Sequence, residues 1–222
     1  MKKVKSLKAV AACSFLFMFT ALISCKDKET ESYQAGPVHP KVEKLKLPTG
    51  FLAEHLYSPG DNGKGSWVAM TFDDKDRLIT SDQFGALYRL EIPASDTIEP
   101  KVEKLIIGEG NEADSLSVGM GYAQGLVWAF NSLYVMVNNH SNNEEFSKSS
   151  GLYRLQDTNG DDQFDKVTLL KTLVGSGEHG PHSIVLSPDK QSLYVVAGNH
   201  TDVPEMETYQ ASCSVGLRQS FS

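Results

Sequence analysis

From about residue 42 onward, short apolar runs rich in Val, Leu, Tyr and Phe are separated by Gly, Asn, Asp and Pro. Runs of this kind between turn-forming residues are typical of β-strands. No segment keeps a 3.6-residue apolar period with capping residues at both ends, so we expect few helices. The pattern predicts an all-β fold.

The runs recur as a repeated unit. Gly-Ala-Leu-Tyr-Arg-Leu at 85–90 returns as Gly-Leu-Tyr-Arg-Leu at 151–155, and Ser-Leu-Tyr-Val at 132–135 returns at 192–195. Four antiparallel strands per unit, repeated along the chain, are typical of the blades of a β-propeller. The predicted strands are 67–72, 77–80, 87–90 and 102–107 in the first unit, 125–130, 133–137, 152–155 and 167–173 in the second, and 182–186 and 193–197 in the third.

Residues 42–206 hold two full units and the first half of a third. We therefore expect a β-propeller fragment, about two and a half four-stranded blades of a six-bladed ring, because closed propellers have about four to eight blades. Residues 207–222 lose the pattern, and we interpret them as the aberrant or truncated tail of a longer gene product. An open β-sheet protein and part-rings that assemble by oligomerisation are the alternatives.

The N-terminus has the pattern of an export signal. Four lysines precede an uncharged run at 9–23, which is shorter than the roughly 20 residues that span a bilayer as a helix. Residues 1–24 are therefore predicted to be a signal peptide. Leu-Ile-Ser-Cys at 22–25 resembles a bacterial lipobox, which implies a lipid on Cys25 that anchors an exported protein to the membrane, facing the periplasm or on the cell surface. A plain secretory signal with an incidental cysteine is the alternative.

Residues 25–41 are polar and predict a tether between lipid and domain. Their charged segment, 26–31, resembles the surface-export signal of some Bacteroidetes lipoproteins, although a solvated tether explains it equally well. The formal charge of −7 becomes −11 once residues 1–24, with four lysines and no acid, are removed. Nucleic acid is therefore not an expected partner, because phosphate binding needs clustered Lys and Arg.

The most informative motif is Gly-Glu-His-Gly-Pro-His at 177–182, followed by Ser-Pro-Asp at 187–189, Leu-Tyr-Val at 193–195 and Gly-Asn-His at 198–200. It resembles the glucose/sorbosone dehydrogenase β-propellers of the soluble quinoprotein type, over about residues 45–206 and most specifically 151–204. The resemblance implies oxidation of a sugar or polyol, with His179 as the base and pyrroloquinoline quinone (PQQ) and Ca²⁺ as cofactors. It further implies cofactor contacts from His182, Asn199 and His200, and an electron acceptor protein.

This sequence departs from the family motif at several positions. Pro181 and His182 replace glycines, Ser183 replaces an arginine, and Asn199 replaces an acid. Serine cannot supply the bidentate carboxylate recognition of arginine. The alternative function is a non-catalytic propeller lipoprotein that binds glycan or protein.

Two structural alternatives for the histidines also stay open. In the first alternative, the motif at 179–182 is only a tight connection between strands, and its imidazoles are solvated. In the other, His179, His182 and His200 hold zinc with Glu178 nearby, although this spacing is not specific for zinc.

A second candidate site is the acidic stretch 157–165. Asp157, Asn159, Asp161 and Asp165 stand at positions 1, 3, 5 and 9 of a pattern that resembles a calcium loop. Asp162 stands where an EF-hand needs Gly, and Thr168 where it needs Glu, so a true EF-hand is excluded. The alternative is a simple hairpin loop in which Asn159-Gly160 supplies positive φ angles.

Overall fold

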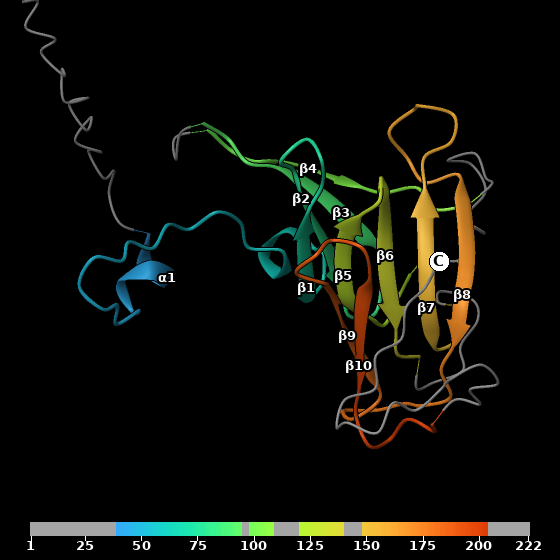
Figure 1. The fold of residues 1–222 in the computed structure, drawn as a ribbon. Helices are drawn as coiled ribbons and strands as arrows, with labels where there is room; N and C mark the ends of the chain where they lie inside the picture. The colour runs from blue at the N-terminus through green and yellow to red at the C-terminus, as the bar shows by residue number, and fades with distance from the viewer. Residues whose placement is uncertain (1–38, 95–97, 109–119, 140–147, 204–222) are drawn as a thin grey trace, which may run out of the picture. The chain divides into compact units, whose positions relative to one another are not determined.

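The computed structural model describes residues 39–94, 98–108, 120–139 and 148–203. Within these ranges the regular structure is almost entirely antiparallel β (Figure 1). The helical segments there are α1 (Pro40–Glu43) and a single 3-10 turn, Gly60–Asn62. The predictions of an all-β fold and of few helices are confirmed for this part of the chain.

The strands form three sheets in chain order. Sheet 1 contains β1 (Trp67–Phe72), β2 (Leu78–Asp82), β3 (Leu87–Glu91) and β4 (Lys101–Lys104). Sheet 2 contains β5 (Ala123–Ala129), β6 (Ser132–Val137), β7 (Gly151–Gln156) and β8 (Lys166–Thr172). Sheet 3 contains β9 (Pro181–Leu186) and β10 (Leu193–Ala197). In every sheet each strand pairs with the next one along the chain, so each is an antiparallel meander.

The observed strands lie where the sequence predicts them, and β1 and β10 have the predicted bounds. The largest difference is at β4, which ends at Lys104 although the apolar pattern continues to Ile107. The backbone of Ile106 explains the early end, because its amide donates to Gln163 Oε1 over 2.8 Å and its carbonyl accepts from the Phe164 amide over 3.1 Å. Residues 105–107 thus pair in part with the β7–β8 loop that follows β7 (Gly151–Gln156).

Sheet 2 lies between the other two sheets and carries two cores. Because side chains alternate across a strand, β6 turns Leu133 and Val135 into the core with sheet 1, and Tyr134 and Met136 into the core with sheet 3. All six residues of β6 are buried for this reason. Burying a large aliphatic side chain contributes about 1.5–3 kcal/mol, so the two cores hold the three sheets together.

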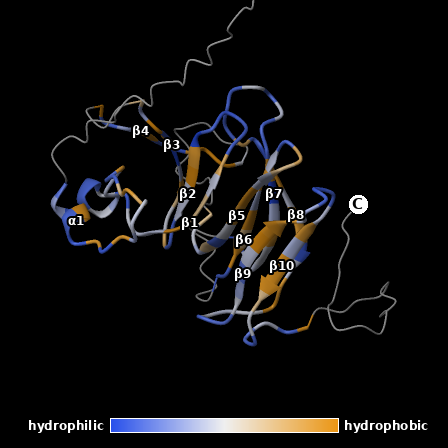
Figure 2. Cartoon of the chain, turned by 60° about the vertical axis from the view of Figure 1, so that its left-hand side comes forward, coloured by the Kyte–Doolittle hydropathy of each residue, from blue (hydrophilic) through white to orange (hydrophobic). Residues whose placement is uncertain are grey.

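The first strands of successive sheets are neighbours. β1 contacts β5, and β5 contacts β9 (Figure 1). Polar bonds cross the first of these junctions: the Trp128 amide donates to Thr71 Oγ1 over 3.2 Å, and Ser81 Oγ donates to the Ala123 carbonyl over 2.8 Å. Figure 2 shows hydrophobic residues along the strands, whereas the connections between them are mostly hydrophilic.

Candidate functional site

The loop before β9 and the loop after β10 lie together at one end of sheet 3. The His200 amide donates to the His179 carbonyl over 3.0 Å, and the Gly198 amide donates to the Gly180 carbonyl over 3.0 Å. The rings of His179 and His200 are exposed and meet edge to face, with centroids 4.9 Å apart and ring planes at 86°. Two of the predicted site histidines are therefore neighbours.

The other two predicted contacts are placed differently. The half-buried His182 has its Nδ1 2.7 Å from the Gly180 carbonyl oxygen, so this nitrogen donates and Nε2 is left as the acceptor in the neutral ring. Asn199 is exposed in the turn that follows β10. The structure thus places His179 on the loop before β9, His182 on β9 itself, and Asn199 and His200 on the adjoining turn after β10. Among these four residues, the rings in contact are those of His179 and His200.

Glycines allow these loops to approach each other. A Cβ atom on Gly198 would lie 2.4 Å from the His179 carbonyl oxygen, and one on Gly180 would lie 2.3 Å from Asn138 Oδ1. Both distances are too short for a side chain, so glycine at 198 lets the two histidine loops approach each other, and glycine at 180 lets the loop before β9 pack against Asn138.

Asn138 is a supporting residue that was not among the predicted site residues. Its side chain is buried directly after β6, and Nδ2 donates to the Gly177 carbonyl over 2.7 Å. Its Oδ1 is buried and has no hydrogen-bond partner in the described part of the chain. The available sequence signal was a polar Asn immediately after a strand that is apolar on both faces.

The acidic stretch 157–165 is the loop of the β7–β8 hairpin, whose last paired residues are Gln156 and Lys166. The oxygens of its predicted ligands accept hydrogen bonds from within the loop. These run from Gly160 N and Asp162 N to Asp157, from Asp161 N to Asn159, from Gln163 N to Asp161 and from Thr158 N to Asp165, at 2.6–2.9 Å. The hairpin is thus present, and a calcium ion in it stays a prediction.

The positive φ angles of this loop differ from the expectation. Gly160 has φ of 80°, as predicted, but the second positive value belongs to Asp162, at 69°, and not to Asn159. Asp tolerates this left-handed conformation better than most residues do. The acid at the position of the EF-hand glycine therefore keeps the backbone conformation that such a glycine adopts.

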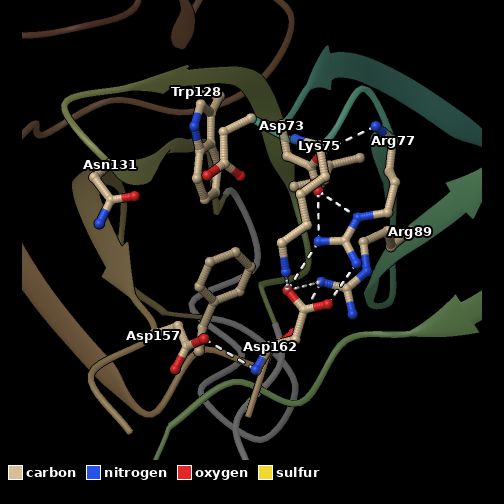
Figure 3. A pocket seen from close by; sticks show the side chains of 11 residues that line it. Asp73, Lys75, Arg77, Arg89, Trp128, Asn131, Asp157 and Asp162 are labelled. Atoms are coloured by element: carbon tan, nitrogen blue, oxygen red, sulfur yellow. Dashed lines mark hydrogen bonds and ion pairs between the residues drawn. The ribbon is translucent and has the colours of Figure 1, made fainter. Parts of the chain in front are cut away.

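The Asp162 carboxylate leaves its own loop and binds three cations of sheet 1 (Figure 3). Its Oδ1 lies 2.8 Å from Arg77 Nη2, 2.9 Å from Lys75 Nζ and 3.2 Å from Arg89 Nη1. Arg77 Nη1 also donates to Oδ2, so this pair is bidentate. Asp162 thus connects the β7–β8 loop with β3 and the β1–β2 turn.

Two further carboxylates complete the network. The side chain of Asp73 is 1% exposed and accepts from Arg77 Nε over 2.8 Å and from the Lys75 and Arg77 amides, each over 2.9 Å. Glu103 accepts from Arg89 Nε over 2.6 Å. Three cations therefore face three carboxylates, which limits the cost of placing these charges between the sheets.

These contacts shift the pKa values of the central pair. The hydrogen bond from Arg77 holds the pKa of the Asp162 carboxyl well below its usual range, against the opposing effect of partial burial. The same bond raises the pKa of the Arg77 guanidinium, which burial lowers. Both groups are therefore charged in the folded protein at neutral pH.

A cavity of about 180 Å³ adjoins this network. Its lining includes Asp73, Asp74, Lys75, Arg77, Ile79, Arg89, Trp128, Asn131, Asp157, Asp162 and Phe164 (Figure 3). Because Arg77, Arg89 and Asp162 bind one another, we interpret the cavity as part of the joint between sheets 1 and 2. The cavity could not be predicted from the sequence, since its charged residues come from separate units of the repeat.

No group of three or more His, Cys, Asp or Glu side chains within the described ranges is arranged to hold a metal ion. Among those same residues, no helix has the length and apolar character needed to span a membrane. Cys25 and residues 207–222 lie outside the ranges that the structure describes.

Comparison with known proteins adds no assignment. No family model matches the chain, and no significant match to a curated protein was found. The resemblance to sugar dehydrogenase propellers therefore still depends on the motif residues between 177 and 200.

Proposed function

We propose that this chain is part of a β-propeller of an exported lipoprotein and that the loops around His179 bind a sugar or polyol. The propeller is supported by the successive antiparallel meanders, whose first strands β1, β5 and β9 are neighbours. Propeller blades are related in this way, with repeated four-stranded sheets around a centre. Sheets 1 and 2 correspond to full blades and sheet 3 to half of one.

The observation that carries the ligand proposal is the exposed pair of His179 and His200 beside the first strand of sheet 3. Imidazole nitrogens can both accept from and donate to the hydroxyl groups of a sugar. His179 is open to solvent, so a bound hydroxyl group can reach it and pass it a proton. Gly198 lets the loop after β10 approach the His179 backbone closely enough for one ligand to contact both rings.

The quinone cofactor implied by the resemblance fits these loops poorly. PQQ carries carboxylates, which are bound best by arginine or lysine. Segments 175–183 and 197–201 contain neither residue type, and Ser183 stands where the family has its arginine. This mismatch favours the second candidate, binding of glycan or protein without oxidation. Oxidation would in addition require an electron acceptor protein.

The lipid anchor at Cys25 belongs to the same proposal. It predicts that the protein fractionates with membranes, facing the periplasm or the cell surface, and is labelled by a fatty-acid analogue. Cys25→Ser should abolish the labelling and release the exported protein from the membrane. Labelling that persists in Cys25→Ser would overturn this part of the proposal.

One experiment separates the two functions. The protein is offered a panel of aldoses, polyols and glycans, first in a binding assay and then with PQQ, Ca²⁺ and a reducible dye. We expect binding that His179→Ala abolishes and that His39→Ala, a change at the N-cap of α1 and outside these loops, leaves intact. Dye reduction lost in His179→Ala would establish an oxidoreductase. Absence of both binding and turnover with the whole panel would overturn the proposal.

A further inference from the structure

The two faces of each sheet have different neighbours along the chain. We call the face turned toward the preceding sheet the head face and the face turned toward the following sheet the tail face. In sheet 2 the head face packs on sheet 1 and the tail face packs on sheet 3. The two internal interfaces are therefore of one kind, tail of one sheet against head of the next.

The head face of sheet 1 is open at its first strand. Leu78 in sheet 1 and Leu133 in sheet 2 occupy equivalent positions of the repeat. Phe72 pairs with Leu78 and Trp128 pairs with Leu133, so Phe72 is the equivalent of Trp128. Met70, two residues before Phe72, is likewise the equivalent of Leu126. Leu126 is 7% exposed in the core between sheets 1 and 2. On β1 the exposed fractions are 40% for Val68, 70% for Met70 and 52% for Phe72. The same position of the repeat is thus covered in sheet 2 and uncovered in sheet 1.

The tail face of sheet 3 is open in the same way. Leu186 pairs with Leu193, which makes Val196 the equivalent of Met136 and Val185 that of Val127. Met136 is fully buried against sheet 3, whereas Val185 is 52% and Val196 56% exposed. The opposite face of sheet 3 is covered, since Ile184 and Leu193 are buried in the core with sheet 2.

Part of the head face of sheet 1 is already covered from within the chain. Trp67 stacks between Tyr57 and Tyr88, with ring centroids 5.3 Å and 5.8 Å away. Trp67 is the first residue of β1 and Tyr88 belongs to β3, so this aromatic stack covers the face at the start of β1. Within the described strands of sheet 1, the exposed large apolar residues all lie on β1, the strand that contacts β5 of sheet 2.

We propose that two copies of this chain associate head to tail, with the tail face of sheet 3 in one copy covering the head face of β1 in the other. The contact repeats an interface that the chain already forms twice within itself. Val185 and Val196 would meet Val68, Met70 and Phe72, so both sides are uncharged and apolar. A contact of this kind is heterologous and leaves one head face and one tail face free unless a ring closes.

The test measures molecular mass by sedimentation or light scattering for the chain carrying Cys25→Ser, so that lipid does not contribute. The concentration runs from about 1 to about 100 µM, where small interfaces dissociate. We expect the average mass to rise at least twofold over that of one chain. Met70→Glu places a charge on the head face, and Val196→Glu places one on the tail face. Each variant alone should therefore remain a single chain.

An equimolar mixture of the two variants is the decisive sample. Each supplies the face that the other lacks, so the mixture should regain the mass of two chains and no more. Val203→Glu, at a position that is 83% exposed beyond β10, is the control and should assemble as the unmodified chain does. Phe72→Lys with Val185→Lys repeats the test should either first variant fail to fold.

Several results would overturn the proposal. An unmodified chain that stays single at every concentration would show that no such association exists. Association that survives Val196→Glu but not Met70→Glu would indicate a head-to-head contact. A mixture that remains single chains would exclude the head-to-tail arrangement.

Discussion

Asp162 and Arg77 join two sheets through a bidentate ion pair, with Asp162 Oδ1 2.8 Å from Arg77 Nη2. The two residues are 85 positions apart in the sequence. Asp162 reaches Arg77 from a left-handed backbone position in the β7–β8 loop, where a glycine would have suited the backbone but supplied no carboxylate. The acid in the place of the calcium-loop glycine thus has a structural explanation, which is the connection between sheets 1 and 2.

Asp162→Asn should lower the free energy of unfolding by about 1–3 kcal/mol. Asparagine keeps the tolerance for positive φ and the side-chain shape, so the change removes mainly the charge. Arg77 and Arg89 are 15% and 5% exposed and each would lose one partner, although Asp73 and Glu103 remain. Urea unfolding measures the loss.

The control for this prediction is Asp161→Asn in the same loop. Its carboxylate bonds only to the loop and to no residue of sheet 1, so we expect a change of about 0.5 kcal/mol or less. Equal losses in both variants would mean that the loop conformation, and not the ion pair, stabilises the joint.

The stability should also depend on acid pH through this pair. Folding lowers the pKa of Asp162, so its contribution is complete above the ordinary carboxyl pKa of about 4 and is lost as the pH falls further. Hydrogen bonds from Thr158 also lower the pKa of Asp165, so the contribution of Asp165 to stability likewise falls as the pH is lowered. Urea unfolding between about pH 6 and about pH 2 should show a shallower decline for Asp162→Asn than for the unmodified protein. Parallel curves would contradict this assignment.

Gly198→Ala should disturb the histidine loops. The new Cβ would lie 2.4 Å from the His179 carbonyl oxygen, a backbone atom that can move only by breaking its bond from the His200 amide. We expect a destabilisation of about 1–3 kcal/mol and altered ring resonances of His179 and His200 by NMR. Gly60→Ala is the control, because its nearest neighbour is 3.9 Å away. Unchanged histidine resonances in Gly198→Ala would show that the loops do not depend on this approach.

The strands could be predicted from the sequence because their determinants are local. Alternating apolar positions and turn residues fix β1 and β10 to the residue. The end of β4 could not be predicted, since it depends on Gln163 and Phe164, which bond to Ile106 from the β7–β8 loop. The same limit applies to the site: the sequence indicated His179 and His200, but Asn138 takes its role from the loop that the fold brings against it.

A calcium titration decides between the two interpretations of the 157–165 loop. The loop amides already bond to Asp157, Asp161 and Asp165, so we expect added Ca²⁺ to leave the melting temperature unchanged. An ion bound only by the folded state would instead stabilise it by about 2.7 kcal/mol at 100 times its dissociation constant. A rise in melting temperature that Ca²⁺ but not Mg²⁺ produces, and that Asp161→Asn removes, would therefore establish a calcium site. An unchanged melting temperature would leave the loop as a hairpin whose one outward-reaching carboxylate, Asp162, serves the joint with sheet 1.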